Sequence, residues 1–173
     1  FTRMQVRFDA SLASDVLAVN GTPDERMLPR LSACLNRVAG TDRPRADITS
    51  TCNFPIAAGL ASSASSFAAL TVAAAAAIGD TTDKVGLARL AGRASGSAAR
   101  SLFGGFVELS NSDDDIEVCE ICPADEWPLK VIVAITATGP KAVGSTEAME
   151  ISRRTSPFYS NWVSQQERDL DIA

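Results

Sequence analysis

Hydrophobic residues alternate with polar ones in some segments of the chain and recur every three or four positions in others. Alternation predicts a strand, because successive side chains of a strand point to opposite faces, and spacing by three and four predicts a helix. In the first sixty residues the strand pattern covers 4–8, 15–19 and 46–52. The helical pattern is formed by Leu28, Leu31, Leu35 and Val38.

Turn and cap residues suggest where the first helix begins. Asn20-Gly21 favours the left-handed backbone of a tight turn. Thr22 as N-cap, Pro23 in the first helical position and Glu25 three residues after the cap form a capping box. The helix is therefore predicted to begin just after Thr22, with Pro29 kinking its first turns.

The rest of the chain interleaves helices, strands and small-residue segments. Helices are predicted for 62–78, from Thr82 onward, from Gly144 and from Ser156. Strands are predicted for 106–109, 116–122 and 129–136, with loops at 93–101 and at Gly139-Pro140. Several strands are linked as hairpins, which favours an α+β fold, a mixed sheet with packed helices, over a doubly wound parallel sheet.

Composition narrows the class of protein. The 173 residues, 46% hydrophobic and 21% charged, are typical of one globular domain. A net charge of −5 argues against a non-specific grip on nucleic acid or anionic lipid. The longest apolar stretch, 67–78, is shorter than the roughly 20 residues that a membrane span needs. We expect a soluble, cytoplasmic protein without a signal peptide. Because the chain has no histidine, it cannot form a His-dependent triad.

Cysteines and clustered carboxylates leave alternatives open. Four cysteines are too few for a disulfide scaffold, and we interpret them as reduced thiols. Cys119 and Cys122 form a C-x-x-C that is either half of a metal site or simply part of a strand, and no second ligand pair accompanies it. The carboxylates of 113–115 form either a solvated hairpin loop or a metal site. In both cases we expect no metal site.

The segment from Pro55 to Ser66 has the chemistry of an anion site. A strand passes through a Gly/Ala/Ser loop directly into a helix, so several backbone N–H groups face one concavity. The helix dipole adds roughly half a positive charge there. Gly59 permits tight backbone, and Ser62 and Ser63 supply hydroxyl donors. The loop is neither a Walker A motif nor a G-x-G-x-x-G motif. Close packing of small residues is the alternative interpretation.

The same loop carries a family resemblance. The sequence Pro-x-x-x-Gly-Leu-Ala-Ser-Ser-Ala-Ser at 55–65 resembles the phosphate loop of the GHMP kinase superfamily. The flanking Asn-Phe-Pro at 53–55 and Ala-Ala-Gly-Leu-Ala-Ser-Ser-Ala at 57–64 narrow the resemblance to the mevalonate diphosphate decarboxylase family. Two further segments, at 95–106 and from 127 to 157, are similar to that family and occur in the same order.

The resemblance implies a GHMP kinase-type N-terminal domain, of the ribosomal protein S5 domain 2-like fold, over residues 1–173. A following helical region would begin at about 156–173. Alternation that is already under way at Met4 and a last helix that reaches Ala173 without a stop signal predict a piece truncated at both ends. The family's substrate-binding Lys would precede Phe1 and its catalytic Asp would follow Ala173, so the chain alone is expected to be inactive. Ala99 stands where the family usually has Cys.

The resemblance also implies a reaction, the ATP-dependent decarboxylation of (R)-5-diphosphomevalonate to isopentenyl diphosphate in isoprenoid biosynthesis, with ATP and Mg²⁺. ATP phosphates would be bound by Gly59, Ala61, Ser62, Ser63 and Ser65. Substrate would be bound by Ser95, Ser97, Arg100, Ser145 and Thr146. By its chemistry alone, Arg100 is either an anion ligand or a surface cation. The full-length protein is a candidate homodimer. A phosphomevalonate decarboxylase, a mevalonate 3-kinase and a non-catalytic phosphate-binding domain are the alternatives.

Overall fold

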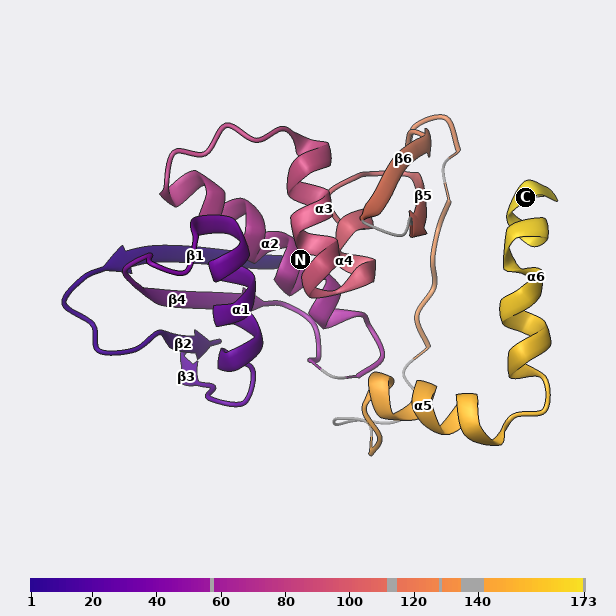
Figure 1. Ribbon diagram of the computed structural model, residues 1–173, viewed down its shortest axis with the longest axis horizontal. Helices are drawn as coiled ribbons and strands as arrows, with labels where there is room; N and C mark the ends of the chain where they lie inside the picture. The colour runs from indigo at the N-terminus through magenta and orange to yellow at the C-terminus, as the bar shows by residue number, and fades with distance from the viewer. Residues whose placement is uncertain (57, 112–114, 128, 135–141, 173) are drawn as a thin grey trace. The chain divides into compact units, whose positions relative to one another are not determined.

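The structure, a computed structural model, describes residues 1–56, 58–111, 115–127, 129–134 and 142–172 (Figure 1). The chain divides into two compact units, Phe1–Thr138 and Gly139–Ala173, and each is described by itself. The first unit holds two sheets and four helices among its described residues, and the second holds two helices. The prediction of an α+β fold with a mixed sheet is confirmed.

The larger sheet has the order β1-β4-β2-β3. Its strands are β1 (Thr2–Asp9), β2 (Val16–Val19), β3 (Thr22–Pro23) and β4 (Arg45–Cys52). The antiparallel β1 and β4 pair along their whole length, from Thr2 opposite Cys52 to Asp9 opposite Arg45, whereas β2 runs parallel to β4. The smaller sheet is a hairpin of β5 (Phe106–Asn111) and β6 (Ile116–Cys122).

Helices cover one face of the larger sheet, because only that face is apolar. The first unit contains α1 (Leu28–Ala39), α2 (Ser62–Ala77), α3 (Lys84–Ala94) and the short α4 (Gly96–Arg100). Helix α2 packs directly on β1, whereas α3 and α4 pack on α2 and on the smaller sheet. Alternate residues of β1 and β4 turn inward against α1 and α2, and the opposite face is polar and exposed. The largest fully buried side chains in this core are Phe67, Leu35, Ile48, Leu70, Thr71 and Cys34.

The predicted capping box is wrong. Asn20 and Gly21 both have positive φ, as the predicted turn requires, but this turn sends Thr22 and Pro23 back along β2 as strand β3. The side chain of Asp24 then accepts hydrogen bonds from the next backbone N–H groups, which delays the helix until Leu28. Pro29 lies in the first turn of α1 and does not kink it, because the first turn needs no N–H donor there.

The predicted helix at Thr82 begins two residues later. Asp83 is its N-cap and accepts a hydrogen bond from the Gly86 N–H at 2.8 Å. The predicted small-residue loop at 93–101 is helical instead: α3 continues to Ala94 and α4 follows after Ser95. Small residues give this result because Ala91, Ala98 and Ala99 are fully buried, which lets the helices approach each other closely.

The strand predicted for 129–136 is also wrong over its described part. Residues 129–134 form no strand and pair with no other strand in the described chain, although four of their side chains are apolar and exposed, namely Leu129, Val131, Ile132 and Val133. A strand is stable only when its backbone groups pair with a neighbour, which apolar sequence alone does not supply. The remaining two predicted residues and the Gly139-Pro140 turn lie outside the described residues.

The second unit contains α5 (Ser145–Thr155) and α6 (Tyr159–Ile172). The helix predicted from Gly144 is confirmed, with Gly144 as its N-cap. The helix predicted from Ser156 is confirmed but begins at Tyr159, where the Ser156 hydroxyl accepts a hydrogen bond from the Phe158 N–H. Among the described residues no helix is long and apolar enough to cross a membrane.

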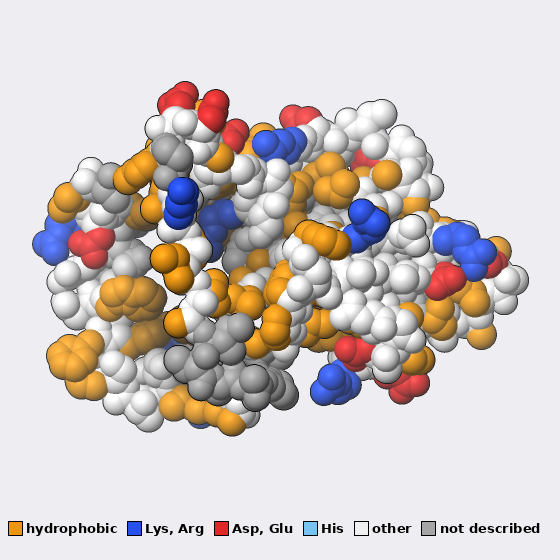
Figure 2. Space-filling view, turned by 180° about the vertical axis from the view of Figure 1, so that it is seen from behind, with side chains coloured by type: hydrophobic (Ala, Val, Ile, Leu, Met, Phe, Trp, Pro, Cys, Tyr) orange, Lys and Arg blue, Asp and Glu red, His pale blue; other side chains and the backbone are white. Residues whose placement is uncertain are grey.

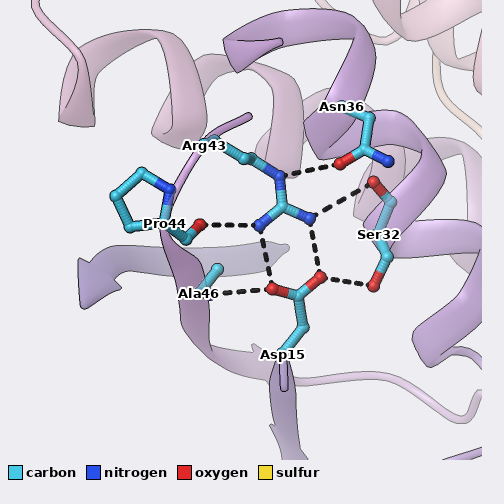
Figure 3. Close-up of polar contacts among 6 residues, drawn as sticks. All are labelled: Asp15, Ser32, Asn36, Arg43, Pro44 and Ala46. Carbon is cyan, nitrogen blue, oxygen red and sulfur yellow. Dashed lines mark hydrogen bonds and ion pairs between the residues drawn. The ribbon is translucent and has the colours of Figure 1, made fainter. Parts of the chain in front are cut away.

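A buried ion pair joins three elements of the first unit (Figure 3). Arg43 and Asp15 have side chains that are only 2% and 5% exposed. The Asp15 carboxylate also accepts from the Ser32 hydroxyl of α1 at 2.6 Å and from the Ala46 N–H of β4 at 2.8 Å. Arg43 donates further to the side chain of Asn36 at 3.0 Å. This network locks the loop before β4 against α1 and the start of β2.

Candidate phosphate-binding site

The candidate site is centred on the connection between β4 and α2. Gly59 has a φ of +87°, and Ala61, the N-cap of α2, has a φ of +51° in the left-handed region. Ala61 therefore bends the chain sharply into the helix, a conformation that costs an alanine free energy. An alanine N-cap has no side-chain oxygen to accept hydrogen bonds from the first amides, and the first turn contains no acidic residue.

These features make the start of α2 suited to an anion. The first N–H groups of a helix have no carbonyl partner within it, and the helix dipole places positive potential there. Gly59 and Ala61 are exposed, and Ser62 and Ser63 are half-buried at the same turn. The structure thus brings four of the five predicted ATP-phosphate residues together at one open helix terminus.

Ser65, the fifth predicted ATP-phosphate residue, is engaged on the inner side of the helix. Its Oγ lies 2.8 Å from Thr2 Oγ1 and donates to the Ser62 carbonyl at 3.1 Å. A groove of about 700 Å³ runs beside this contact between β1, α2 and α3, and its polar lining comes from Thr2, Ser65, Lys84 and Ser101. Lys84 also lies 4.1 Å above the ring of Phe103.

The second predicted segment lies on a helix that packs against α2. Ser95 is the N-cap of α4, and its carbonyl accepts from the Ala98 N–H at 2.7 Å. Ser97 is half-buried, whereas Arg100 is exposed at the end of α4. Burial of Ala98 and Ala99 on the other side of α4 leaves Arg100 pointing away from the core. The segment predicted to bind substrate therefore lies against α2, the helix that follows the Gly/Ala/Ser loop.

The other predicted residues belong to other elements of the chain. Ser145 and Thr146 open α5 in the second unit, and both are exposed. Asp115, at the end of the predicted acidic loop, accepts a hydrogen bond from Arg93 Nε at 3.1 Å, and the rest of that loop lies outside the described residues. The described residues contain no cluster of three or more metal-ligating side chains.

Sequence reasoning overlooked Thr2 and the Asp15–Arg43 pair. Thr2 shares the inward parity of Met4 and Val6, so strand alternation extended by one step would have placed it against α2. The pairing of Asp15 with Arg43 carries no local signal, because 28 residues separate the partners.

On the face shown in Figure 2, basic side chains are scattered among acidic and uncharged ones and form no continuous basic patch. Exposed ion pairs such as Arg7–Asp47 and Arg93–Asp115 contribute to this pattern. The first amides of α2 and the helix dipole supply positive potential locally, which requires no broad basic surface.

Comparison with solved structures supports the fold. Mevalonate diphosphate decarboxylase from Staphylococcus aureus superposes with a TM-score of 0.78 at 32% identity, over 98% of this chain and 53% of that one. The enzyme from Enterococcus faecalis gives 0.76 at 33% identity, over 98% and 53%. A complex described as MDDEF with MVAPP, AMPPCP and magnesium gives 0.79 at 34% identity.

Sequence comparison points to the same family. Diphosphomevalonate decarboxylases from Ganoderma lucidum and Bos taurus are 38% and 36% identical, over 88% and 82% of this chain. The chain spans 43% and 40% of these relatives, less than half of their length. The family profile described as "Diphosphomevalonate decarboxylase-like N-terminal domain" matches residues 1–119. This chain therefore belongs to the family of diphosphomevalonate decarboxylase-like N-terminal domains.

Proposed function

We propose that the protein containing this chain decarboxylates mevalonate 5-diphosphate to isopentenyl diphosphate at the expense of ATP, and that this chain supplies much of its phosphate-binding surface. The observation that carries the proposal is the start of α2, where an alanine N-cap in the left-handed region follows a Gly/Ala/Ser loop. That arrangement occurs in a chain whose family relatives are diphosphomevalonate decarboxylases.

In the proposed reaction the tertiary 3-hydroxyl attacks the γ-phosphorus of ATP and ADP leaves. The C3–O bond then breaks and its electron pair departs with phosphate, which leaves cationic character at C3. The C1–C2 bond breaks next, and its electrons form the C2–C3 double bond as carbon dioxide is released. The products are ADP, phosphate, carbon dioxide and isopentenyl diphosphate.

This chain would act on the charged groups of both reactants. The start of α2, with Gly59, Ala61, Ser62 and Ser63, would bind and orient the ATP phosphates. Mg²⁺ would arrive bound to ATP and neutralise part of its charge. The general base that takes the 3-hydroxyl proton would be the family's Asp, which the resemblance assigns to sequence beyond this chain.

Binding of mevalonate 5-diphosphate would fall to the segment around α4, where Ser95, Ser97 and the exposed Arg100 would contact its carboxylate and diphosphate. For Ser145 and Thr146, at the start of α5, a role in substrate binding rests on the family resemblance alone. The planar guanidinium of Arg100 can bind two oxygens of such a group at once. We further propose that the parent protein acts in the cytoplasm.

The test is to assay the parent protein with mevalonate, its 5-phosphate and its 5-diphosphate side by side. The proposal predicts ATP consumption with the 5-diphosphate at a kcat/KM at least about a hundredfold above the other two. Preference for the 5-phosphate would indicate a phosphomevalonate decarboxylase, and preference for mevalonate a mevalonate 3-kinase. Nucleotide binding without turnover of any of the three would indicate a non-catalytic phosphate-binding domain.

A further inference from the structure

One threonine side chain contacts both ends of the phosphate loop. Thr2 begins β1 and pairs with Cys52, the last residue of β4 and the point where the chain leaves the sheet. Thr2 Oγ1 lies 3.8 Å from Cys52 Sγ. The same oxygen lies 2.8 Å from the Oγ of Ser65, in the first turns of α2 where the chain has returned from the loop.

The hydrogen bonds of the Thr2 and Ser65 hydroxyls have a definite direction. The Ser65 hydroxyl has a single proton and donates it to the Ser62 carbonyl at 3.1 Å. In that arrangement the Thr2 hydroxyl gives its single proton to Ser65, so Cys52 Sγ at 3.8 Å is a contact of Thr2 and not a second acceptor. The side chain of Ser65 is therefore engaged with β1 and with its own helix.

Separate hydrogen bonds hold Cys52, at the end of β4, in place. The Cys52 N–H donates to Asn20 Oδ1 in the β2–β3 turn at 2.9 Å, and Cys52 Sγ donates to the Phe54 carbonyl at 3.4 Å. Cys52 is thus held in place, and the backbone pairing of β1 with β4 ties Thr2 to it. The hydrogen bond from the Thr2 hydroxyl to Ser65 then links this strand pair to the first turns of α2.

We infer that Thr2 is a positioning residue for nucleotide: its hydroxyl joins the paired strands β1 and β4 to α2 and sets the geometry of the amides that would receive ATP phosphates. The inference rests on the proposed function for the identity of the ligand. A threonine fits this place because its β-branched side chain suits the strand while its hydroxyl reaches the helix.

The first measurement tests the contact between Thr2 and Ser65 in the absence of nucleotide. In the parent protein, Thr2→Val keeps the shape and removes the hydroxyl, Thr2→Ser keeps the hydroxyl, and Thr49→Val makes the same exchange at an exposed position on the outer face of β4. Amide hydrogen exchange at Ser63–Ser65 should be faster by about threefold to tenfold in Thr2→Val, the change expected for the loss of one hydrogen bond. It should be unchanged in Thr2→Ser and Thr49→Val.

The second measurement reads ligand affinity. Thr2→Val should raise the dissociation constant of a non-hydrolysable ATP analogue by about threefold to tenfold and leave that of mevalonate 5-diphosphate unchanged, with Thr2→Ser restoring the wild-type value. Ser65→Ala, which removes the other partner, should have the same effect. The double variant should be no worse than either single variant, because both remove one interaction.

Unchanged exchange in both Thr2→Val and Ser65→Ala would overturn the inference. So would weakened ATP binding in Ser65→Ala alone, because Ser65 would then contact the phosphates directly. If the wild-type parent binds no ATP but its exchange responds to Thr2→Val and not to Thr49→Val, the proposed function fails, and with it the role of Thr2 toward nucleotide. The connection that Thr2 makes between the β1–β4 pair and α2 would still stand.

Discussion

Arg43 grips the carboxylate of Asp15 with two hydrogen bonds, from Nη1 at 2.8 Å and from Nη2 at 2.6 Å, and both side chains are almost completely buried. The pair lies where the loop before β4 meets α1 and the start of β2 (Figure 3). Every buried side-chain nitrogen and oxygen in the described residues has a partner, so this network is fully satisfied. Removing one member would leave a buried charge without its counterpart.

Arg43→Met should therefore destabilise the domain by about 3–5 kcal/mol, the usual result of breaking a buried pair from one side. The matched control is Arg7→Met, which breaks the Arg7–Asp47 pair, in which the side chains are 70% and 40% exposed. It should cost no more than about 1 kcal/mol. Chemical denaturation followed by circular dichroism measures both, and equal losses would show that the Asp15–Arg43 pair is no more important than a surface contact.

Low pH should weaken the stabilisation that the Asp15–Arg43 network provides. Hydrogen bonds from Arg43, Ser32 and the Ala46 N–H hold the pKa of Asp15 well below its usual range, although desolvation opposes them. Stabilisation from a carboxylate with a lowered pKa is complete above the pKa of the unfolded state, about 3.9, and is lost as pH falls below it. Stability should thus decline between about pH 5 and pH 3 more steeply in the wild type than in Asp15→Asn/Arg43→Met. Parallel declines in the two proteins would contradict the assignment.

A carboxylate introduced at the start of α2 should weaken ATP binding. Ser63→Asp in the parent protein places a negative charge at the first turn of α2, where the ATP phosphates would bind, so ATP affinity should fall at least about tenfold. Affinity for mevalonate 5-diphosphate should change much less. Ser160→Asp, in the first turn of α6, is the control and should leave both affinities unchanged. Calorimetric titration measures them, and an equal loss for both ligands with an intact fold would assign the loop to the wrong ligand.

Substitution of Arg100 should impair the reaction of mevalonate 5-diphosphate and not the binding of ATP. If its guanidinium pairs with the substrate, Arg100→Met removes a charge-assisted contact that typically contributes about 2–5 kcal/mol. The parent variant should lose at least about thirtyfold in kcat/KM for mevalonate 5-diphosphate and keep its ATP dissociation constant. Arg37→Met, at another exposed arginine, on α1, is the control. Wild-type turnover by Arg100→Met would identify Arg100 as a surface cation.

Local patterns predicted most of the fold. Alternation from Met4 and the β-branched run from Ala46 located β1 and β4, and the Ala-rich segment between Ser62 and Gly79 located α2. Errors arose where the structure depends on pairing with another strand and not on the local sequence signal. The capping signal at Thr22 lost to pairing with β2, and the apolar run from Leu129 has no neighbouring strand among the described residues.

In the candidate site, too, local features could be predicted from the sequence and contacts between distant residues could not. The Gly/Ala/Ser loop could be recognised because its backbone chemistry is written in consecutive residues. The contact of Thr2 with Ser65 could not, because it joins residues 63 positions apart through a strand and a helix. Arg100 could be chosen from its sequence neighbours, but its exposure and the packing of α4 against α2 required the fold.

The most direct test of the central claim is the stoichiometry of the reaction of the parent protein with ATP, Mg²⁺ and mevalonate 5-diphosphate labelled at its carboxyl carbon. Our account predicts one labelled carbon dioxide and one free phosphate for each ADP formed. ADP formation without labelled carbon dioxide would mean that the protein only phosphorylates its substrate. If neither ADP nor carbon dioxide forms while ATP still binds, the start of α2 belongs to a binding module and the proposed decarboxylation is wrong.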